Sequence, residues 1–237
     1  MAQFIAANTP SNLPLLGLAH FAILGAVALL GGALAILQRR FFRQSSLLRL
    51  SVGTVLLAET LAWYAYQLYL GQLTFPDHLP LELCDVTLVL TLIALFSLSA
   101  AVFDLAYYGA LAGTTMALLT PDLWERFPSL STCQFFFGHG LVVASVLYLA
   151  WSGLTRPRAG SVRRAMLAFN AWAVIAGGFD WLFGTNYMYL REKPQSATLL
   201  NWLGPWPWYI ATGEVVALVL FLLLYLPFWR RAACGKT

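Results

Sequence analysis

Long apolar runs, each about the length of a membrane span, alternate with short polar segments along the chain. About 20 apolar residues are needed for a helix to cross the hydrocarbon core of a bilayer. Seven runs meet this requirement, at residues 14–38, 51–72, 84–101, 104–120, 134–154, 165–185 and 207–229. The pattern predicts an all-α polytopic membrane protein with seven transmembrane helices. We see no internal repeat, so residues 1–237 are expected to form a single domain.

Composition supports a membrane protein and excludes a nucleic-acid binder. The chain is 60% hydrophobic and only 10% charged, whereas a soluble domain carries about 25% charged residues. The net charge of +4 comes from basic residues in short clusters between the apolar runs, rather than along one polar face. A membrane surface explains this charge better than nucleic acid does.

The basic clusters predict the orientation of the spans. Positive residues are enriched in cytoplasmic loops. Three clusters hold four, four and three of the 14 basic residues: Arg39, Arg40, Arg43 and Arg49; Arg156, Arg158, Arg163 and Arg164; and Arg230, Arg231 and Lys236. Seven spans place all three clusters on one side of the membrane. We therefore expect the N-terminus outside and the C-terminus in the cytoplasm.

Ionisable residues inside the apolar runs gather toward the outer side. Such residues are costly in lipid and by default face the interior of a helix bundle. Counting along the predicted helices places these residues in the outer half: His20, Cys84, Asp85, His139, Asp180 and Glu214. The inner half is expected to be almost purely apolar, with Asp104 as a helix N-cap. Interhelical hydrogen bonds are the structural alternative for these groups, with Asn170, Thr212 or a histidine as possible partners of Asp180 and Glu214.

Cys84 and His139 have the chemistry of an acyl-transfer pair. A nearby imidazole activates a thiol and later protonates the leaving group, and a carboxylate such as Asp180 orients the ring. The substrate of such a site would be an acyl ester of a membrane lipid. A disulfide between Cys84 and Cys133 is the competing interpretation. Three cysteines without CxxC spacing predict no metal site, and the chemistry needs no cofactor.

Five motifs resemble the YwaF-type integral membrane family of bacteria: LPLELCD (79–85), LLTPDL (118–123), QFFFGHG (134–140), GTNYMYL (184–190) and LLNWLGPWPWY (199–209). That family is similar to eukaryotic transmembrane protein 164, a phospholipid acyltransferase with a Cys–His pair. It is more distantly similar to androgen-induced-type hydrolases of fatty-acid esters. The resemblance implies a multi-pass protein of a bacterial inner membrane that acts on phospholipids or fatty-acyl esters.

The same resemblance assigns roles to individual residues. His139 is the matching histidine, and the family cysteine falls at Cys84 or nearer Leu81. Asn186 and Tyr187 are implied as pocket or headgroup residues, beside Asp85, Glu214 and His20 as substrate-binding candidates.

Two other classes of function compete with a lipid acyltransferase, transacylase or ester hydrolase. A small-solute transporter would use the outer acids and histidines as its vestibule, but it also needs polar groups in the inner half and paired broken helices. A non-enzymatic assembly or sensor protein is favoured if Cys84 is locked in a disulfide. The sequence leaves the oligomeric state open.

Overall fold

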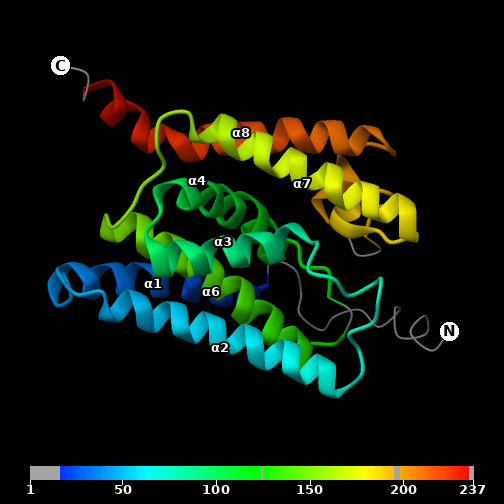
Figure 1. Ribbon diagram of the computed structural model, residues 1–237, viewed down its shortest axis with the longest axis horizontal. Helices are drawn as coiled ribbons and strands as arrows, with labels where there is room; N and C mark the ends of the chain where they lie inside the picture. Colours follow the sequence, from blue (N-terminus) through cyan, green and yellow to red (C-terminus); the bar gives the residue numbers. More distant parts are fainter. Residues whose placement is uncertain (1–16, 124, 195–197, 235–237) are drawn as a thin grey trace.

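The computed structural model describes residues 17–123, 125–194 and 198–234, and these contain helices and no strand (Figure 1). The order is α1 (Leu18–Arg40), α2 (Leu47–Tyr69), α3 (Leu83–Ser97), α4 (Ala100–Tyr108), the π-helix η2 (Gly109–Thr114), α5 (Thr115–Leu119), α6 (Leu130–Ser152), α7 (Ser161–Phe183), the 3₁₀ turns η3 (Tyr187–Tyr189) and η4 (Leu199–Trp202), and α8 (Trp208–Cys234). The all-α class is confirmed.

Six helices in the described part of the chain are long and apolar enough to cross a membrane. They are α1, α2, the continuous rod Ala100–Leu119, α6, α7 and α8. The remaining rod, α3, has 15 residues and is about 22 Å long, which is less than the roughly 30 Å of the hydrocarbon core. The chain is therefore a multi-pass membrane protein with six candidate spans and one shorter apolar helix. Residues 14–16 of the first predicted span lie outside the described residues.

The centre of the bundle is formed by α6 and by the rod α4–η2–α5. About 61% of the apolar window of α6 is buried, against 11% for α7 and α8. Tyr108, Tyr148 and Phe103 are the largest fully buried side chains. The outer helices instead present apolar side chains such as Leu29 and Val174 to the surroundings. An apolar exterior of this kind is suited to lipid rather than water.

Small residues bring α1 and α6 close together along their length. A Cβ on Gly31 would lie 2.8 Å from the Cβ of Leu147, and a Cβ on Gly140 would lie 2.8 Å from a methyl group of Val27. Any larger residue at either position would separate the helices. Membrane helices commonly pack through small residues in this way, because their backbones can then approach closely.

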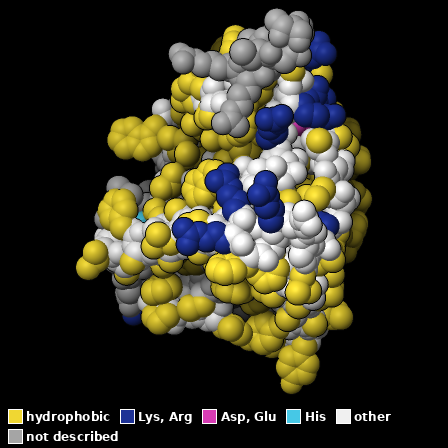
Figure 2. All heavy atoms as spheres, turned by 90° about the vertical axis from the view of Figure 1, so that its left-hand side faces the viewer, with side chains coloured by type: hydrophobic (Ala, Val, Ile, Leu, Met, Phe, Trp, Pro, Cys, Tyr) yellow, Lys and Arg dark blue, Asp and Glu magenta, His cyan; other side chains and the backbone are white. Residues whose placement is uncertain are grey.

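The rods run alternately between two ends of the bundle (Figure 1). The two ends differ in charge. The end with loops 41–46 and 153–160 is called the basic end, and the opposite end, where α3 and α8 begin, is called the acidic end. Figure 2 looks onto the basic end, where arginine side chains gather among hydrophobic ones. The third basic cluster, Arg230, Arg231 and Lys236, lies outside the described side chains.

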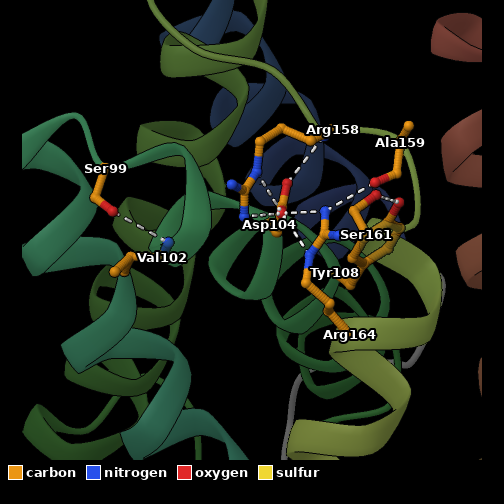
Figure 3. A network of polar contacts seen from close by, with 8 residues as sticks. All are labelled: Ser99, Val102, Asp104, Tyr108, Arg158, Ala159, Ser161 and Arg164. Carbon is orange, nitrogen blue, oxygen red and sulfur yellow. Dashed lines mark hydrogen bonds and ion pairs between the residues drawn. The ribbon is translucent and has the colours of Figure 1, made fainter. Parts of the chain in front are cut away.

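The prediction that Asp104 is a helix N-cap is wrong (Figure 3). The chain turns at Leu98, which has a left-handed φ of 53°, and the hydroxyl of Ser99 caps α4 by accepting from the N–H of Val102. Asp104 lies one turn further on and is fully buried. Its carboxylate accepts hydrogen bonds from the backbone and side chain of Arg158 and from the side chain of Arg164. Arg158 and Arg164 thereby tie the loop before α7 to α4.

The half of the bundle nearer the basic end is also more polar than expected. The Tyr148 hydroxyl donates to the Gln38 side chain at 2.7 Å, and the Tyr108 and Ser161 hydroxyls lie 2.8 Å apart. All four side chains are buried. Each group has a hydrogen-bond partner, which removes the cost of burying it. These contacts join α1 to α6 and α4 to α7.

Candidate functional site at the acidic end

The first turn of α3 concentrates polar groups at the acidic end. Glu82 is the N-cap, and its backbone N–H donates to the Asp85 carboxylate at 3.1 Å. Asp85 also contacts the hydroxyl of Tyr64 on α2. Carboxylates in the first turn are favoured, because the N-terminus of a helix carries partial positive charge. Cys84 lies between these two acids in the sequence.

The segment after α7 packs against this turn. Gly184 ends α7 with a φ of 77°, a left-handed conformation that favours glycine. The backbone N–H of Met188 donates to the Glu82 carboxylate at 2.9 Å. Met188 and Tyr189 both have left-handed φ values, 55° and 54°, which are strained for residues with side chains. The strained turn therefore presents a backbone donor to the acid that begins α3.

Asp180 holds the same segment from the end of α7. The residue is fully buried, and one carboxylate oxygen accepts from the Thr185 hydroxyl at 2.7 Å and from the N–H of Tyr187 at 2.9 Å. The Tyr187 hydroxyl in turn donates to the carbonyl of Pro76 and accepts from the N–H of Leu79. Asp180 is therefore a folding determinant of the site.

Three further hydrogen bonds close the site. The hydroxyl of Tyr189 donates to the Asp122 carboxylate at 2.9 Å, and the hydroxyl of Tyr209 donates to the carbonyl of Tyr189. These bonds connect the strained turn to the segment after α5 and to the start of α8. Trp172 on α7 donates from its indole to the carbonyl of Leu81, 3.0 Å away. The sequence prediction missed Tyr189, Asp122 and Trp172 as site residues. Tyr189 and Asp122 lie in predicted outer loops, whereas Trp172 lies inside the predicted span 165–185 and gives no signal in the sequence.

Three carboxylates at this end have no basic side chain as an ion-pair partner among the described residues. In the described part of the chain, no lysine or arginine lies within ion-pair distance of Glu82, Asp85 or Asp180. Burial raises the pKa of Glu82 to about 7, the negative charges of the neighbouring acids add to the rise, and the Met188 N–H opposes it. Burial likewise raises the pKa of Tyr189. The Glu82 carboxyl can therefore gain or lose a proton near neutral pH.

The expected pairing of Cys84 with His139 is not present in the structure. Cys84 faces Thr114 at the end of η2, and neither Cys84 nor Cys133 is near a histidine. Nδ1 of His139 lies 2.9 Å from the carbonyl of Phe135, and the imidazole stacks on the Phe135 ring at 4.1 Å. The physical reason is that the imidazole folds back along its own helix, where the carbonyl one turn earlier accepts its proton. The alternative disulfide is also wrong, because Cys84 and Cys133 are both free thiols.

The other predicted binding residues lie apart from one another. Nε2 of His20 is 2.8 Å from the carbonyl of Leu118, in a fully buried position. Glu214 accepts from the side chain of Asn170 at 2.8 Å, so of the structural partners considered for it, Asn170 is the one that links α7 to α8. The Asn186 side chain donates to the carbonyl of Glu192 and accepts from two N–H groups of the same loop. The structure brings Asp85, Asp180 and Tyr187 together around Glu82 and Cys84. No three His, Cys, Asp or Glu side chains converge as a metal site in the described residues.

Comparison with known proteins agrees with this architecture. The model of the TMEM164 family matches residues 13–225, which is most of the chain and includes every residue of the acidic end described above. No curated protein and no solved structure matches. The resemblance to transmembrane protein 164 is thereby confirmed at the level of the family, and the narrower YwaF-type membership stays a prediction. The chain belongs to the TMEM164 family of membrane proteins.

Proposed function

We propose that this protein transfers or hydrolyses acyl groups of membrane phospholipids or fatty-acyl esters at the acidic end, with Cys84 as the nucleophile. The observation that carries the proposal is the first turn of α3, where Cys84 lies between the half-buried acids Glu82 and Asp85 and the strained turn at Met188 donates a hydrogen bond to Glu82. The partial positive charge of a helix N-terminus favours a thiolate, but burial and the negative charges of Asp85 and Glu82 raise the pKa of the Cys84 thiol, so the reaction needs a base beside it. Strained backbone is commonly found at active sites.

Glu82 is the proton carrier in this proposal, because His139 is turned toward Phe135. The Glu82 carboxylate takes the proton of the Cys84 thiol, and the thiolate attacks the carbonyl carbon of a lipid ester. The ester C–O bond breaks as the thioester forms, and Glu82 returns the proton to the departing lyso-lipid oxygen. A second hydroxyl group, from an acceptor lipid or from water, then gives its proton to Glu82 and attacks the thioester, which frees the thiol. A carboxyl with a pKa near the working pH is suited to both directions of transfer.

The proposed topology places this chemistry in the outer leaflet. With α3 counted as a seventh span, the N-terminus lies outside, the arginine-rich end lies in the cytoplasm, and the membrane is a bacterial inner membrane. Cysteine labelling from outside tests this arrangement. A membrane-impermeant maleimide should label Cys133, which is exposed at the acidic end, in intact cells. If Cys133 is labelled only after the cells are lysed, the orientation is the reverse of the one proposed.

The function is tested by intact mass spectrometry of protein incubated with phospholipid. We expect a hydroxylamine-labile adduct of acyl mass that is lost in Cys84→Ala and retained in the matched control Cys133→Ala. Glu82→Gln should slow formation of the adduct at least about 100-fold, the usual range for general acid–base catalysis. His139→Gln separates this proposal from the one implied by the family resemblance. Loss of the adduct in His139→Gln but not in Glu82→Gln would mean that His139, and not Glu82, transfers the proton. An adduct that still forms in Cys84→Ala would mean that Cys84 is not the nucleophile.

A further inference from the structure

The basic end contains a cavity of about 380 Å³ that is distant from the acidic end. It lies between the C-terminal ends of α1 and α6 and the part of α8 around Pro227, with the rod of α4 and η2 behind it. Its lining residues include Arg39, Tyr107, Leu111, Ala150, Trp151 and Phe228. Arg39 and Trp151 are next to the last residues of α1 and α6, so the cavity is at the depth where headgroups meet hydrocarbon in the spanning helices.

The walls of the cavity are suited to hydrocarbon. The hydroxyl of Tyr107 donates to the carbonyl of Leu224 on α8 at 3.1 Å, so its polar tip is satisfied. The Tyr107 and Phe228 rings meet edge to face with centroids 5.8 Å apart. Leu111 belongs to the π-helix η2, and Pro227 interrupts the hydrogen bonding of α8 next to Phe228. Irregular turns of this kind are frequent at functional sites of helical proteins.

The mouth of the cavity carries positive charge. Nε of Arg39 donates to the carbonyl of Ser152 at 3.4 Å, which draws the side chain from α1 across to the end of α6. In the described part of the chain, no carboxylate lies within ion-pair distance of Arg39. Asp104, the acid nearest to the loops of this end, already accepts from Arg158 and Arg164. The charge of Arg39 is thus left for an anion from outside the chain.

We propose that this cavity binds an anionic phospholipid of the leaflet at the basic end, with its phosphate on Arg39 and the upper part of one acyl chain against Tyr107, Leu111 and Phe228. Small-molecule sites have volumes of roughly 300–1,000 Å³, so about 380 Å³ holds part of a lipid rather than the whole molecule. The rest of the chains then lie along the exposed apolar surface of α1 and α8. Basic pockets between membrane helices are suited to anionic headgroups. The site is separate from the proposed acyl-transfer centre.

Native mass spectrometry of detergent-purified protein tests the proposal with two lipids of identical acyl chains, phosphatidylglycerol and phosphatidylcholine. The wild type should retain phosphatidylglycerol in preference. Arg39→Gln should weaken its binding roughly five- to tenfold, as expected for one arginine near the membrane surface. Arg40→Gln is the matched control, because Arg40 is the neighbouring exposed arginine and does not line the cavity. It should bind as the wild type does.

Ala150→Phe, which fills the cavity, should lower binding of both lipids without changing the preference between them. Equal retention of the two lipids by the wild type would overturn the proposal, and so would equal losses in Arg39→Gln and Arg40→Gln. Unchanged binding by a folded Ala150→Phe variant would place the lipid outside the cavity. Thermal unfolding and size-exclusion profiles of each variant establish that it is folded.

Discussion

Asp104 is expected to be the most sensitive charged residue of the basic end. Its carboxylate is 1% exposed and accepts from Nη2 of Arg158 and Nη2 of Arg164, each 2.8 Å away. It also accepts from the backbone N–H of Arg158 at 2.9 Å. Asp104→Asn keeps the shape of the side chain but replaces one acceptor oxygen by an amide that donates. That amide would face guanidinium groups, which are also donors.

The size of the effect follows from the burial of each partner. Removing one member of a fully buried ion pair costs about 3–5 kcal/mol. The two arginine side chains are 45% and 40% exposed, so water partly replaces the lost contact. We therefore expect Asp104→Asn to lower the free energy of unfolding by about 2–3 kcal/mol. Arg158→Gln and Arg164→Gln should each cost only about 1 kcal/mol, because the other arginine still neutralises the acid.

Thermal unfolding in lipid nanodiscs, followed by tryptophan fluorescence, measures this order. At about 2–4 °C per kcal/mol for a chain of this size, Asp104→Asn should lower the midpoint by roughly 5–10 °C and each arginine variant by roughly 2–4 °C. The reasoning is refuted if Asp104→Asn is neutral. It is also refuted if either single arginine substitution costs as much as the loss of the aspartate.

Three further predictions concern the acidic end and the packing of α4. The pKa of Glu82 is raised from 4.5 to about 7, so the folded state holds the proton of this carboxyl more tightly than the unfolded state does. The resulting stabilisation, on the order of 3 kcal/mol, is present below about pH 4.5 and is lost as the pH rises through 7. Glu82→Gln should therefore flatten the pH dependence of the unfolding midpoint over that range. Tyr187→Phe should cost about 1–3 kcal/mol and speed hydrogen exchange at Leu79, whose N–H loses its acceptor; unchanged exchange would contradict the bond. Gly109→Ala should lower the unfolding midpoint, since its Cβ would clash with the Thr87 hydroxyl. Gly25→Ala, with no atom within 4 Å, should be neutral or stabilising by about 0.5–1 kcal/mol, and equal effects would contradict the close packing.

The positions of the helices could be predicted from the sequence because polar segments interrupt the apolar runs. The run at 134–154 corresponds to Leu130–Ser152, and the run at 165–185 corresponds to Ser161–Phe183. The boundary between the third and fourth runs was misplaced, since the intervening residues are apolar except for a serine and an aspartate. The turn at Leu98 and the cap at Ser99 decide it locally. The length of an apolar run predicts a helix, but it carries little information on a turn of two residues.

The site was predicted in part, because depth along a helix can be counted but rotation about its axis cannot. Cys84, Asp85 and Asp180 were placed at the outer end, and they lie together at the acidic end. The direction of His139 depends on the carbonyl of Phe135, a contact that any helical histidine can make. Sequence pattern alone does not show when it is made. The left-handed turn at Met188 and Tyr189 likewise has no signal, because neither residue favours that conformation.

The separation of charge between the two ends connects the proposals. At the acidic end, Glu82, Asp85 and Asp180 have no arginine or lysine within ion-pair distance among the described residues, and a raised pKa keeps Glu82 partly protonated near neutral pH. At the basic end, Arg158 and Arg164 share one buried acid, and Arg39 is left with a backbone carbonyl. A chain that served only as a stable bundle would gain if each of these charged groups had an oppositely charged partner nearby. Their separation instead leaves a proton carrier beside a thiol at one end and an unneutralised arginine at the mouth of an apolar cavity at the other. An acyl-ester site and an anionic-lipid site are the two kinds of chemistry that these arrangements suit.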